Sequence, residues 1–334
     1  MINRDNSPDA IKGMCILLMV FGHVSYIGSF TSSLYTVKAF IYTFHMPLFL
    51  ILSGYFFSFN ANIQNSALKI LKRIALPYLI FIFLYLVGLI LVQYLGIKTT
   101  NVAPKTISEF IRIIFLNPIG GYWFLHSLIV IQLSILFSRY VTARFSSDTK
   151  SIAIALLISI FILLIMTKFG VVTFRTVTYF ILGIIVKQLY PDGFSFPFKL
   201  SLLLVVLFYL GNTFWLIDIY NLFSASEVIW CLLLTSFFWS LFIIFKDNYV
   251  TNLMAYLGRN TLIILVLHAL FIVVMKPLNN LFLVLDATGI MQSLIVTVIT
   301  LVLCLFSARV FDYLNITRFI FNVENIYSKQ DRTG

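Results

Sequence analysis

The chain has 334 residues, of which 61% are hydrophobic and 10% carry charge, and its formal net charge is +11. Apolar stretches of roughly 17 to 22 residues recur along it, each long enough to cross a hydrocarbon layer of about 30 Å. This composition excludes a water-soluble domain and predicts an all-α, polytopic membrane protein, whose positive charge is assigned to membrane topology and not to nucleic-acid binding.

The apolar pattern predicts about ten transmembrane helices in a single membrane domain over residues 1–334. The longest connection, 96–121, is shorter than the roughly 50 residues that a separate folded domain needs. The first stretch begins near Ala10, is long for the core of a cleavable signal, and is interpreted as an uncleaved first span. The predicted spans are 10–30, 37–58, 74–95, 121–138, 151–167, 171–189, 200–217, 228–245, 256–275 and 290–310.

The first predicted span contains a charge and an imidazole, Lys12 and His23. At about 100° and 1.5 Å per residue, the eleven steps between them make roughly three turns, so both side chains lie on one face about 16 Å apart. Asp9, three residues before Lys12, joins the same stripe. Ionisable groups in a membrane helix are costly and usually mark a pathway or a site, so this stripe is the first candidate.

The second predicted span contains His45, followed by Pro47. The proline ring removes a donor and disrupts the helical bond to the carbonyl of Thr43. We therefore expect a kink that opens a small polar hole beside His45, because irregular backbone at membrane depth is tolerated where it lines a cavity or is packed in protein. A purely structural kink with a hydrogen-bonded histidine is the alternative.

A basic run, Lys69, Lys72 and Arg73, follows the second span. Lys69 and Lys72 are one helical turn apart and could present a joint surface to phosphates. Ordinary retention of positive charge on the cytoplasmic side is the alternative, and charge alone favours it over phosphate binding. With both termini cytoplasmic, that side holds most of the 23 basic residues and a tail of about 312–334, and the outer side keeps Lys38, Lys98, Lys105, Arg112, Lys168, Arg175 and Lys276.

Residues 105–116, between the third and fourth spans, predict an amphipathic helix on the outer surface. Thr106 and Glu109 fit a capping box at its start. The helix is either an ordinary covering element or a lid over the site. Its apolar residues recur at helical spacing and are Ile107, Phe110, Ile111, Ile114 and Phe115.

All four histidines fall inside predicted spans, at one level roughly 8 to 12 Å from the outer ends. Neutral imidazole accepts a proton near pH 7 and imidazolium returns it, as a general base requires. His23 is the first choice, with His45 assisting. His126 and His268 are candidates on the substrate side, together with Trp123, or are structural histidines satisfied by hydrogen bonds.

The three cysteines, Cys15, Cys231 and Cys304, are isolated within apolar stretches. They show no CxxC pattern and no cysteine–histidine ligand spacing. We interpret them as buried small hydrophobic residues and predict no metal site.

Five stretches carry a family resemblance: DAIKGMCILLMVFGH (9–23), FHMPLFLILSGYFF (44–57), LKRIALPY (71–78), YWFL (122–125) and LGRNTLIILVLH (257–268). Together they resemble the acyltransferase-3 family of membrane O-acyltransferases, and within it the fucose 4-O-acetylase-like branch. The first two stretches are fairly specific, and the others support them.

The resemblance implies about ten membrane helices, an acyl-coenzyme A donor that approaches from the cytoplasm, and transfer to a hydroxyl of a carbohydrate or similar acceptor. The family's essential Arg and His, separated by ten residues, map onto Lys12 and His23. Lysine keeps the charge but loses the bidentate fork of arginine. A family basic motif linked to the donor's phosphates maps onto Lys69, Lys72 and Arg73.

The leading hypothesis is an O-acetyltransferase of the bacterial inner membrane that moves acetyl from cytoplasmic acetyl-CoA to a surface or lipid-linked glycan, alone or with glycan-assembly proteins. The phosphates of the donor would lie near Lys12 and the basic run, and His23 would take the acceptor's proton. A glycan or small-molecule transporter with a protonatable site is the alternative, since a wet cavity with histidines suits both classes. A sensory or scaffold protein is a third interpretation, and the lack of an HxxxxD run disfavours other acyltransferase classes.

Overall fold

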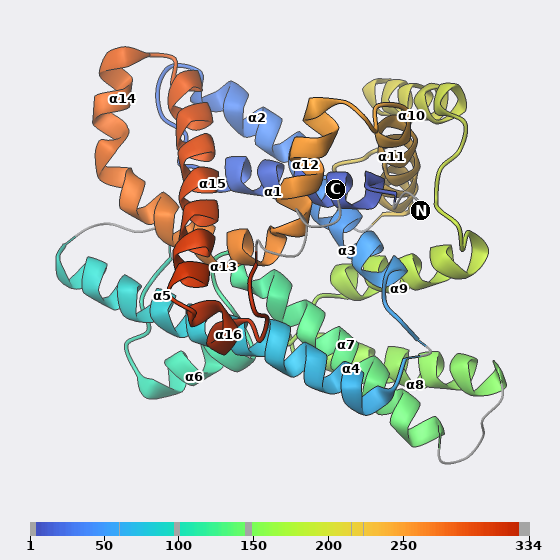
Figure 1. Cartoon of the computed structure of the whole chain (residues 1–334). Helices are drawn as coiled ribbons and strands as arrows, with labels where there is room; N and C mark the ends of the chain where they lie inside the picture. The colour runs from blue at the N-terminus through green and yellow to red at the C-terminus, as the bar shows by residue number, and fades with distance from the viewer. Residues whose placement is uncertain are drawn as a thin grey trace. The chain divides into compact units, whose positions relative to one another are not determined.

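The computed structural model describes residues 5–59, 61–96, 101–143, 149–214, 216–222 and 224–326, and these residues form helices and no strand (Figure 1). The hydropathy of the chain and the helical assignment therefore agree. The helices, in chain order, are α1 (Ser7–His23), α2 (Thr31–Tyr42), α3 (His45–Tyr55), α4 (Ile63–Ile70), the π-helix η1 (Leu71–Ala75), α5 (Leu76–Tyr94), α6 (Ile107–Phe115), α7 (Tyr122–Thr142), α8 (Thr149–Lys168), α9 (Phe174–Leu189), α10 (Phe198–Thr213), α11 (Ala225–Ile244), α12 (Tyr249–Arg259), α13 (Thr261–Met275), the 3₁₀ turn η2 (Lys276–Leu278), α14 (Asn279–Leu285), α15 (Ile290–Tyr313) and α16 (Ile316–Ile320).

Each of the predicted spans falls on one helix or on consecutive helices, so the protein is a multi-pass membrane protein. The number of ten spans and the side on which the termini lie stay predictions. Six helical segments among the described residues are long and apolar enough to cross a membrane: Thr31–Tyr55, Ile63–Tyr94, Tyr122–Thr142, Ala225–Ile244, Thr261–Leu278 and Ile290–Tyr313. Two other apolar helices, Ala153–Lys168 and Phe198–Thr213, are shorter than a full span.

The chain folds into two compact units. Their boundaries fall at the loop after α3 and within α9, α13 and α15, so several helices contribute to both. Unit 1 consists of residues 1–57, 178–264 and 274–302, and unit 2 of residues 58–177, 265–273 and 303–334.

Unit 1 is built on two close helix crossings at glycines. A Cβ on Gly13 of α1 would lie 1.8 Å from the carbonyl oxygen of Met254 on α12, and one on Gly258 of α12 would lie 1.7 Å from the carbonyl oxygen of Asp9. Gly54 of α3 and Gly183 of α9 form a second crossing of this kind. Without side chains at the crossing the backbones approach closely, as small residues allow between membrane helices.

The predicted kink beside His45 falls at Thr43 and Phe44, where the regular helix is interrupted between α2 and α3. Because Pro47 has no N–H, the carbonyl of Thr43 loses its helical donor. In the structure this carbonyl accepts from Sγ of Cys231 at 3.4 Å, and the Thr43 hydroxyl accepts from the indole N–H of Trp230 at 3.1 Å. The irregular backbone is confirmed, and side chains of α11 occupy the polar space that the sequence predicts as a hole.

Unit 2 contains a helical segment of 32 residues, Ile63–Tyr94, formed by α4, η1 and α5. Pro77 lies near the start of α5, and the π-turn just before it carries a bond from Leu76 N–H to the Leu71 carbonyl. A π-turn adds one residue to a turn and is one way in which a helix accommodates a proline. The basic run therefore lies inside a helix and not in the loop before it.

The contacts of Tyr78 on α5 place it beside a residue that the predicted spans put at another level. The predicted boundaries 74–95 and 121–138 put Tyr78 near the cytoplasmic end and His126 near the outer end, levels about 15 Å apart. In the structure the two rings lie 5.9 Å apart, and farther along α7 Arg139 donates to the carbonyl of Ala61 at 3.1 Å. The helix that carries the third predicted span begins at Ile63, eleven residues before the predicted start of the span at residue 74.

A helix, α6 (Ile107–Phe115), lies within the predicted range 105–116. The Thr106 hydroxyl accepts from Glu109 N–H at 3.1 Å, and the Glu109 carboxylate accepts from Lys105 N–H at 2.8 Å. Ile107 and Ile111 are exposed in the chain alone, which leaves an apolar face for a membrane surface. Its position on the outer surface, and a lid role, stay predictions.

The predicted C-terminal tail is folded where the structure describes it. The carboxylate of Asp312 accepts from the Thr317 hydroxyl at 2.6 Å and from Ile326 N–H at 2.9 Å, which closes the chain around α16. Phe321 is buried beside Phe81 of α5, with ring centroids 6.1 Å apart. Residues 327–334 of the predicted tail, and the predicted outer residue Lys98, lie outside the described residues.

Candidate functional site

The first candidate residues are positioned by α1, which runs without interruption from Ser7 to His23. Asp5 precedes the helix, and its carboxylate accepts from Ser7 N–H at 2.9 Å and from the indole N–H of Trp239 at 3.0 Å. Pro8 in the first turn is favourable because its missing N–H needs no helical partner there. The continuous helix confirms the predicted spacing, so Lys12 and His23 are about 16 Å apart along its axis.

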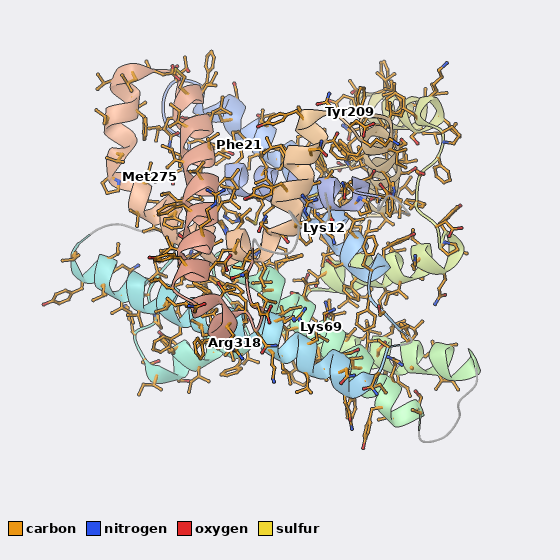
Figure 2. The ribbon with its side chains drawn as sticks, in the orientation of Figure 1. Lys12, Phe21, Lys69, Tyr209, Met275 and Arg318 are labelled. Carbon is orange, nitrogen blue, oxygen red and sulfur yellow. The ribbon has the colours of Figure 1, made fainter. Side chains whose placement is uncertain are left out.

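Lys12 lines a cavity of about 440 Å³ in unit 1 (Figure 2 shows its place on α1). Its ammonium group lies 4.0 Å from the Asp9 carboxylate and 5.0 Å from the centre of the Phe56 ring. The carboxylate and the ring together hold the lysine head at the edge of the cavity. The lining comes from α1, α3, α9, α11 and the segments that adjoin them: Asp5, Pro8, Asp9, Lys12, Tyr55, Phe56, Lys187, Pro191, Asp192 and Trp239.

Lys187 also lines the Lys12 cavity. From the sequence alone it was interpreted only as one of the basic residues that set membrane topology. Its ammonium group lies 4.6 Å from the centre of the Tyr55 ring and donates to the carbonyl of Pro191. The Tyr55 hydroxyl donates to the carbonyl of Tyr190 at 2.7 Å, which fixes the end of α9 against α3. Only the proximity of distant segments reveals this residue, because a lone lysine at a helix end is common.

The charges around Lys12 are mixed. Its cavity is lined by two ammonium groups and by the carboxylates of Asp5, Asp9 and Asp192. A polyphosphate would meet repulsion from these acids, so the cavity is poorly suited to be the main phosphate site. Lys12 is better suited to act as a single point charge than as part of a phosphate clamp.

The two unit 1 histidines are linked through Tyr42. The Tyr42 hydroxyl donates to the carbonyl of Gly22, the residue before His23, at 3.0 Å. Its ring lies 4.9 Å from the ring of His45, centre to centre. Tyr42 therefore connects the last turn of α1 to the break between α2 and α3, which brings the neighbourhoods of His23 and His45 together.

The imidazole of His45 is buried, and its Nδ1 donates to the carbonyl of Ile41 at 2.8 Å. A carbonyl only accepts, so in the neutral ring Nδ1 carries the proton and Nε2 is the basic nitrogen. His23, the last residue of α1, is half-buried. This partial exposure is what a group that must meet a substrate requires.

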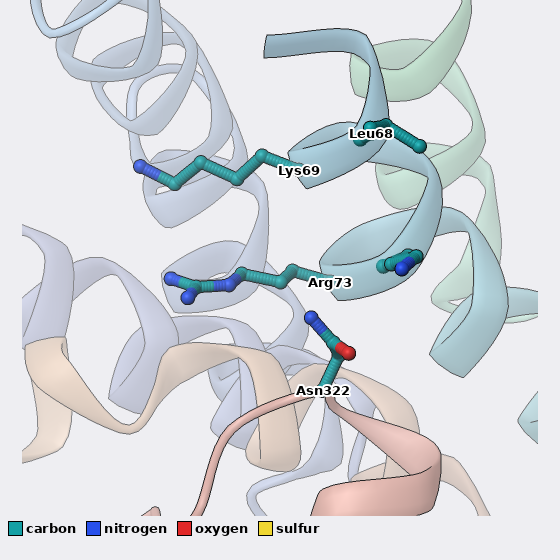
Figure 3. A pocket seen from close by; sticks show the side chains of 5 residues that line it. Leu68, Lys69, Arg73 and Asn322 are labelled. Carbon is teal, nitrogen blue, oxygen red and sulfur yellow. The ribbon is translucent and has the colours of Figure 1, made fainter. Parts of the chain in front are cut away.

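The basic run forms a second hollow, in unit 2, of about 350 Å³. It is lined by Leu68, Lys69, Lys72, Arg73 and, from the C-terminal segment, Asn322. Figure 3 shows Lys69 and Arg73 extending side by side, with the Asn322 side chain pointing toward Arg73. Three cations and an amide without a carboxylate among the lining residues make an environment suited to a phosphate.

The substrate-side candidates all lie in unit 2. His126 is buried and donates from Nε2 to the carbonyl of Phe115 at 2.9 Å, which ties α7 to the end of α6. His268 is buried and donates from Nδ1 to the carbonyl of Leu265 at 3.0 Å. Its ring lies against Gly121, two residues before Trp123. These contacts fit structural histidines, and a substrate role for the three residues stays a prediction.

The cysteines are free and buried, as the sequence predicts. Within the described ranges, histidines, cysteines and acids form no group of three that could hold a metal ion. The charged groups that line the two described cavities are lysines, an arginine and carboxylates.

A protein-family profile described as an acyltransferase domain matches residues 5–309, which is nearly the whole chain. The chain belongs to the acyltransferase-3 family. Lys12, His23 and the basic run all lie within the region that this family covers, whereas Asn322 lies beyond it. The family match and the apolar helices together identify a multi-pass membrane protein of the acyltransferase-3 family.

Among individual proteins, this acyltransferase-3 chain is similar to nodulation protein NolL of Mesorhizobium japonicum. The two are 29% identical over 169 residues, which cover 46% of this chain and 42% of the nodulation protein. The chain thus spans less than half of that relative's length. No solved structure matches the chain.

Proposed function

We propose that this protein is an O-acetyltransferase of a bacterial inner membrane, which moves acetyl from cytoplasmic acetyl-CoA to a hydroxyl of a surface or lipid-linked glycan. The observation that carries the proposal is the unbroken α1, which holds Lys12 and His23 on one helix face at the spacing that the family resemblance implies. Lysine replaces the family's arginine, so the positive charge is retained without the bidentate fork. Acetyl and glycan are chosen from the family resemblance.

In the proposed reaction His23 acts as the general base. It accepts the proton of the acceptor hydroxyl while the oxygen attacks the thioester carbonyl, so a C–O bond forms and the C–S bond breaks. The imidazolium then returns the proton to the departing thiolate, which leaves as free coenzyme A. His45 assists by orienting groups near Tyr42, and Lys12 supplies a fixed positive charge.

The basic hollow is proposed to bind the phosphates of the donor, because its lining is cationic whereas that of the Lys12 cavity is mixed. A combined Lys69→Ala, Lys72→Ala, Arg73→Ala variant should raise the KM for acetyl-CoA by about tenfold or more, because charge-assisted hydrogen bonds are lost. Initial rates at varied donor concentration measure this. An unchanged KM at a normal protein level would indicate that the three residues only help to orient the protein in the membrane.

Tyr42 is expected to be a positioning residue. Tyr42→Phe removes the bond to the Gly22 carbonyl, worth about 0.5–1.5 kcal/mol, and loosens the end of α1. We expect kcat to fall roughly three- to tenfold with little change in donor KM. Tyr35→Phe is the matched control, since Tyr35 contacts the Tyr26 ring and lies outside the link between the histidines. Equal kcat values for the two variants would contradict the positioning role.

The proposed function is tested with purified protein in lipid nanodiscs. Acetyl-CoA and an acceptor glycan should yield free coenzyme A, detected with a thiol reagent, together with an acetylated glycan detected by mass spectrometry. A transporter would release no coenzyme A. Comparison of the surface glycans of cells with and without the gene then identifies the acyl mass and the acceptor together.

A further inference from the structure

The C-terminal segment supplies a residue to the basic hollow. Asn322 lies more than 240 residues after Arg73 in the sequence, and both line the same cavity in unit 2 (Figure 3). Asn322 also lies beyond residue 309, where the family match ends. The hollow is thus completed by a part of this chain outside the matched region.

Asn322 is held in place by its neighbours. Phe321 is only 4% exposed and packs against Phe81, so the backbone next to Asn322 is anchored to α5. The carboxylate of Asp312 accepts from Ile326 N–H on the other side of Asn322, at 2.9 Å. Two fixed points therefore bracket the residue, and its amide is presented to the hollow by a folded segment.

The backbone of Asn322 adopts a left-handed conformation, with φ of 50°. Residues other than glycine rarely do so, and asparagine is among the few that tolerate it. Glycine would meet the conformational need alone, but it would provide no side chain. An asparagine here provides both the turn and an amide that can donate to an anion.

The residues that line the basic hollow include three cations and no carboxylate. Lys69 and Arg73 are four residues apart on one helix, a spacing at which like charges repel. An anion between them relieves this repulsion, and a phosphate offers acceptor oxygens to an ammonium, a guanidinium and an amide at once. The π-turn η1 lies at this point of the helix, and such turns are frequent at functional sites.

We propose that the Asn322 amide donates a hydrogen bond to a phosphate oxygen of the acyl-CoA donor held by Lys69, Lys72 and Arg73. The C-terminal segment is then one wall of the donor site. This inference rests on the proposed function. The same phosphate chemistry is present in anionic lipid headgroups, so the experiment must separate a bound donor from a bound lipid.

The test uses Asn322→Gly, which keeps the left-handed turn and removes the amide. The control is Asn315→Gly, because Asn315 is also left-handed, with φ of 56°, lies on the same segment and does not line the hollow. In nanodiscs of neutral lipid, N322G should raise the KM for acetyl-CoA about tenfold with kcat unchanged. N322D should raise it further, because a carboxylate repels phosphate, and N315G should match the wild type.

The outcomes separate the two proposals. Wild-type protein that neither releases coenzyme A from acetyl-CoA nor is stabilised against heating by coenzyme A would overturn the proposed function. An active wild type with an unchanged KM in N322G and N322D would overturn the role of Asn322 alone. A KM increase that appears only when anionic lipid is added would assign the amide to a lipid headgroup and contradict the donor site.

Discussion

His23→Ala is expected to abolish acyl transfer while the protein remains in the membrane at its normal level. A general base contributes about 10²- to 10⁴-fold to such a reaction, and no other imidazole lies on α1. The remaining rate should lose the pH dependence that the imidazole gives to the wild-type enzyme. Release of free coenzyme A in the presence of acceptor, measured from pH 5 to 9, checks both effects.

Two controls make the His23 result specific. Added imidazole should partly restore the rate of His23→Ala, because it can enter the space left by the side chain and accept the proton, whereas it should not rescue His45→Ala to the same degree. Size-exclusion profiles should show that both variants fold. A wild-type rate in His23→Ala would show that His23 is not the general base, and the role of Asp9, Lys12 and His23 on one face of α1 would then have no explanation.

The sequence predicted most helices because hydropathy and proline are local signals. The break at Thr43 follows from Pro47, and α6 follows from apolar spacing and its cap. The long helix Ile63–Tyr94 was not predicted at its full length, since the charges of the basic run interrupt the apolar window although they do not interrupt the helix. The position of this helix against α7 depends on tertiary contacts, which a single sequence does not reveal.

The candidate site also contains some residues that the sequence alone reveals and others that only the fold reveals. Lys12 and His23 were recognisable because an ionisable group in an apolar stretch is rare, and the basic run because its charges are adjacent in sequence. Lys187, Trp239 and Asn322 were not recognisable, because each is an ordinary residue at its own position. They join cavities only because segments distant in the sequence fold together. In unit 1, close helix crossings at glycines, which were not predicted from the sequence, help to bring these segments together.

The crossing of α1 and α12 supplies the second prediction of large effect (Figure 1). Gly13→Ala or Gly258→Ala would put a methyl group within 2 Å of a backbone carbonyl on the facing helix, where no side chain can move aside. Overpacking of this kind costs about 1–3 kcal/mol in general, and we expect the upper part of that range or more here because backbone must shift.

Both variants should therefore lower the melting temperature and the folded yield, and the surviving protein should lose activity. The reason is that separation of α1 from α12 displaces the turn that holds Asp9 and Lys12. Gly88→Ala is the matched control, since Gly88 lies within α5 and a Cβ there would meet nothing within 4 Å. Replacing an open helical glycine by alanine is neutral or stabilising by about 0.5–1 kcal/mol. Thermal melts in detergent measure all three variants, and a Gly258→Ala protein as stable and active as Gly88→Ala would show that α1 does not depend on this close approach.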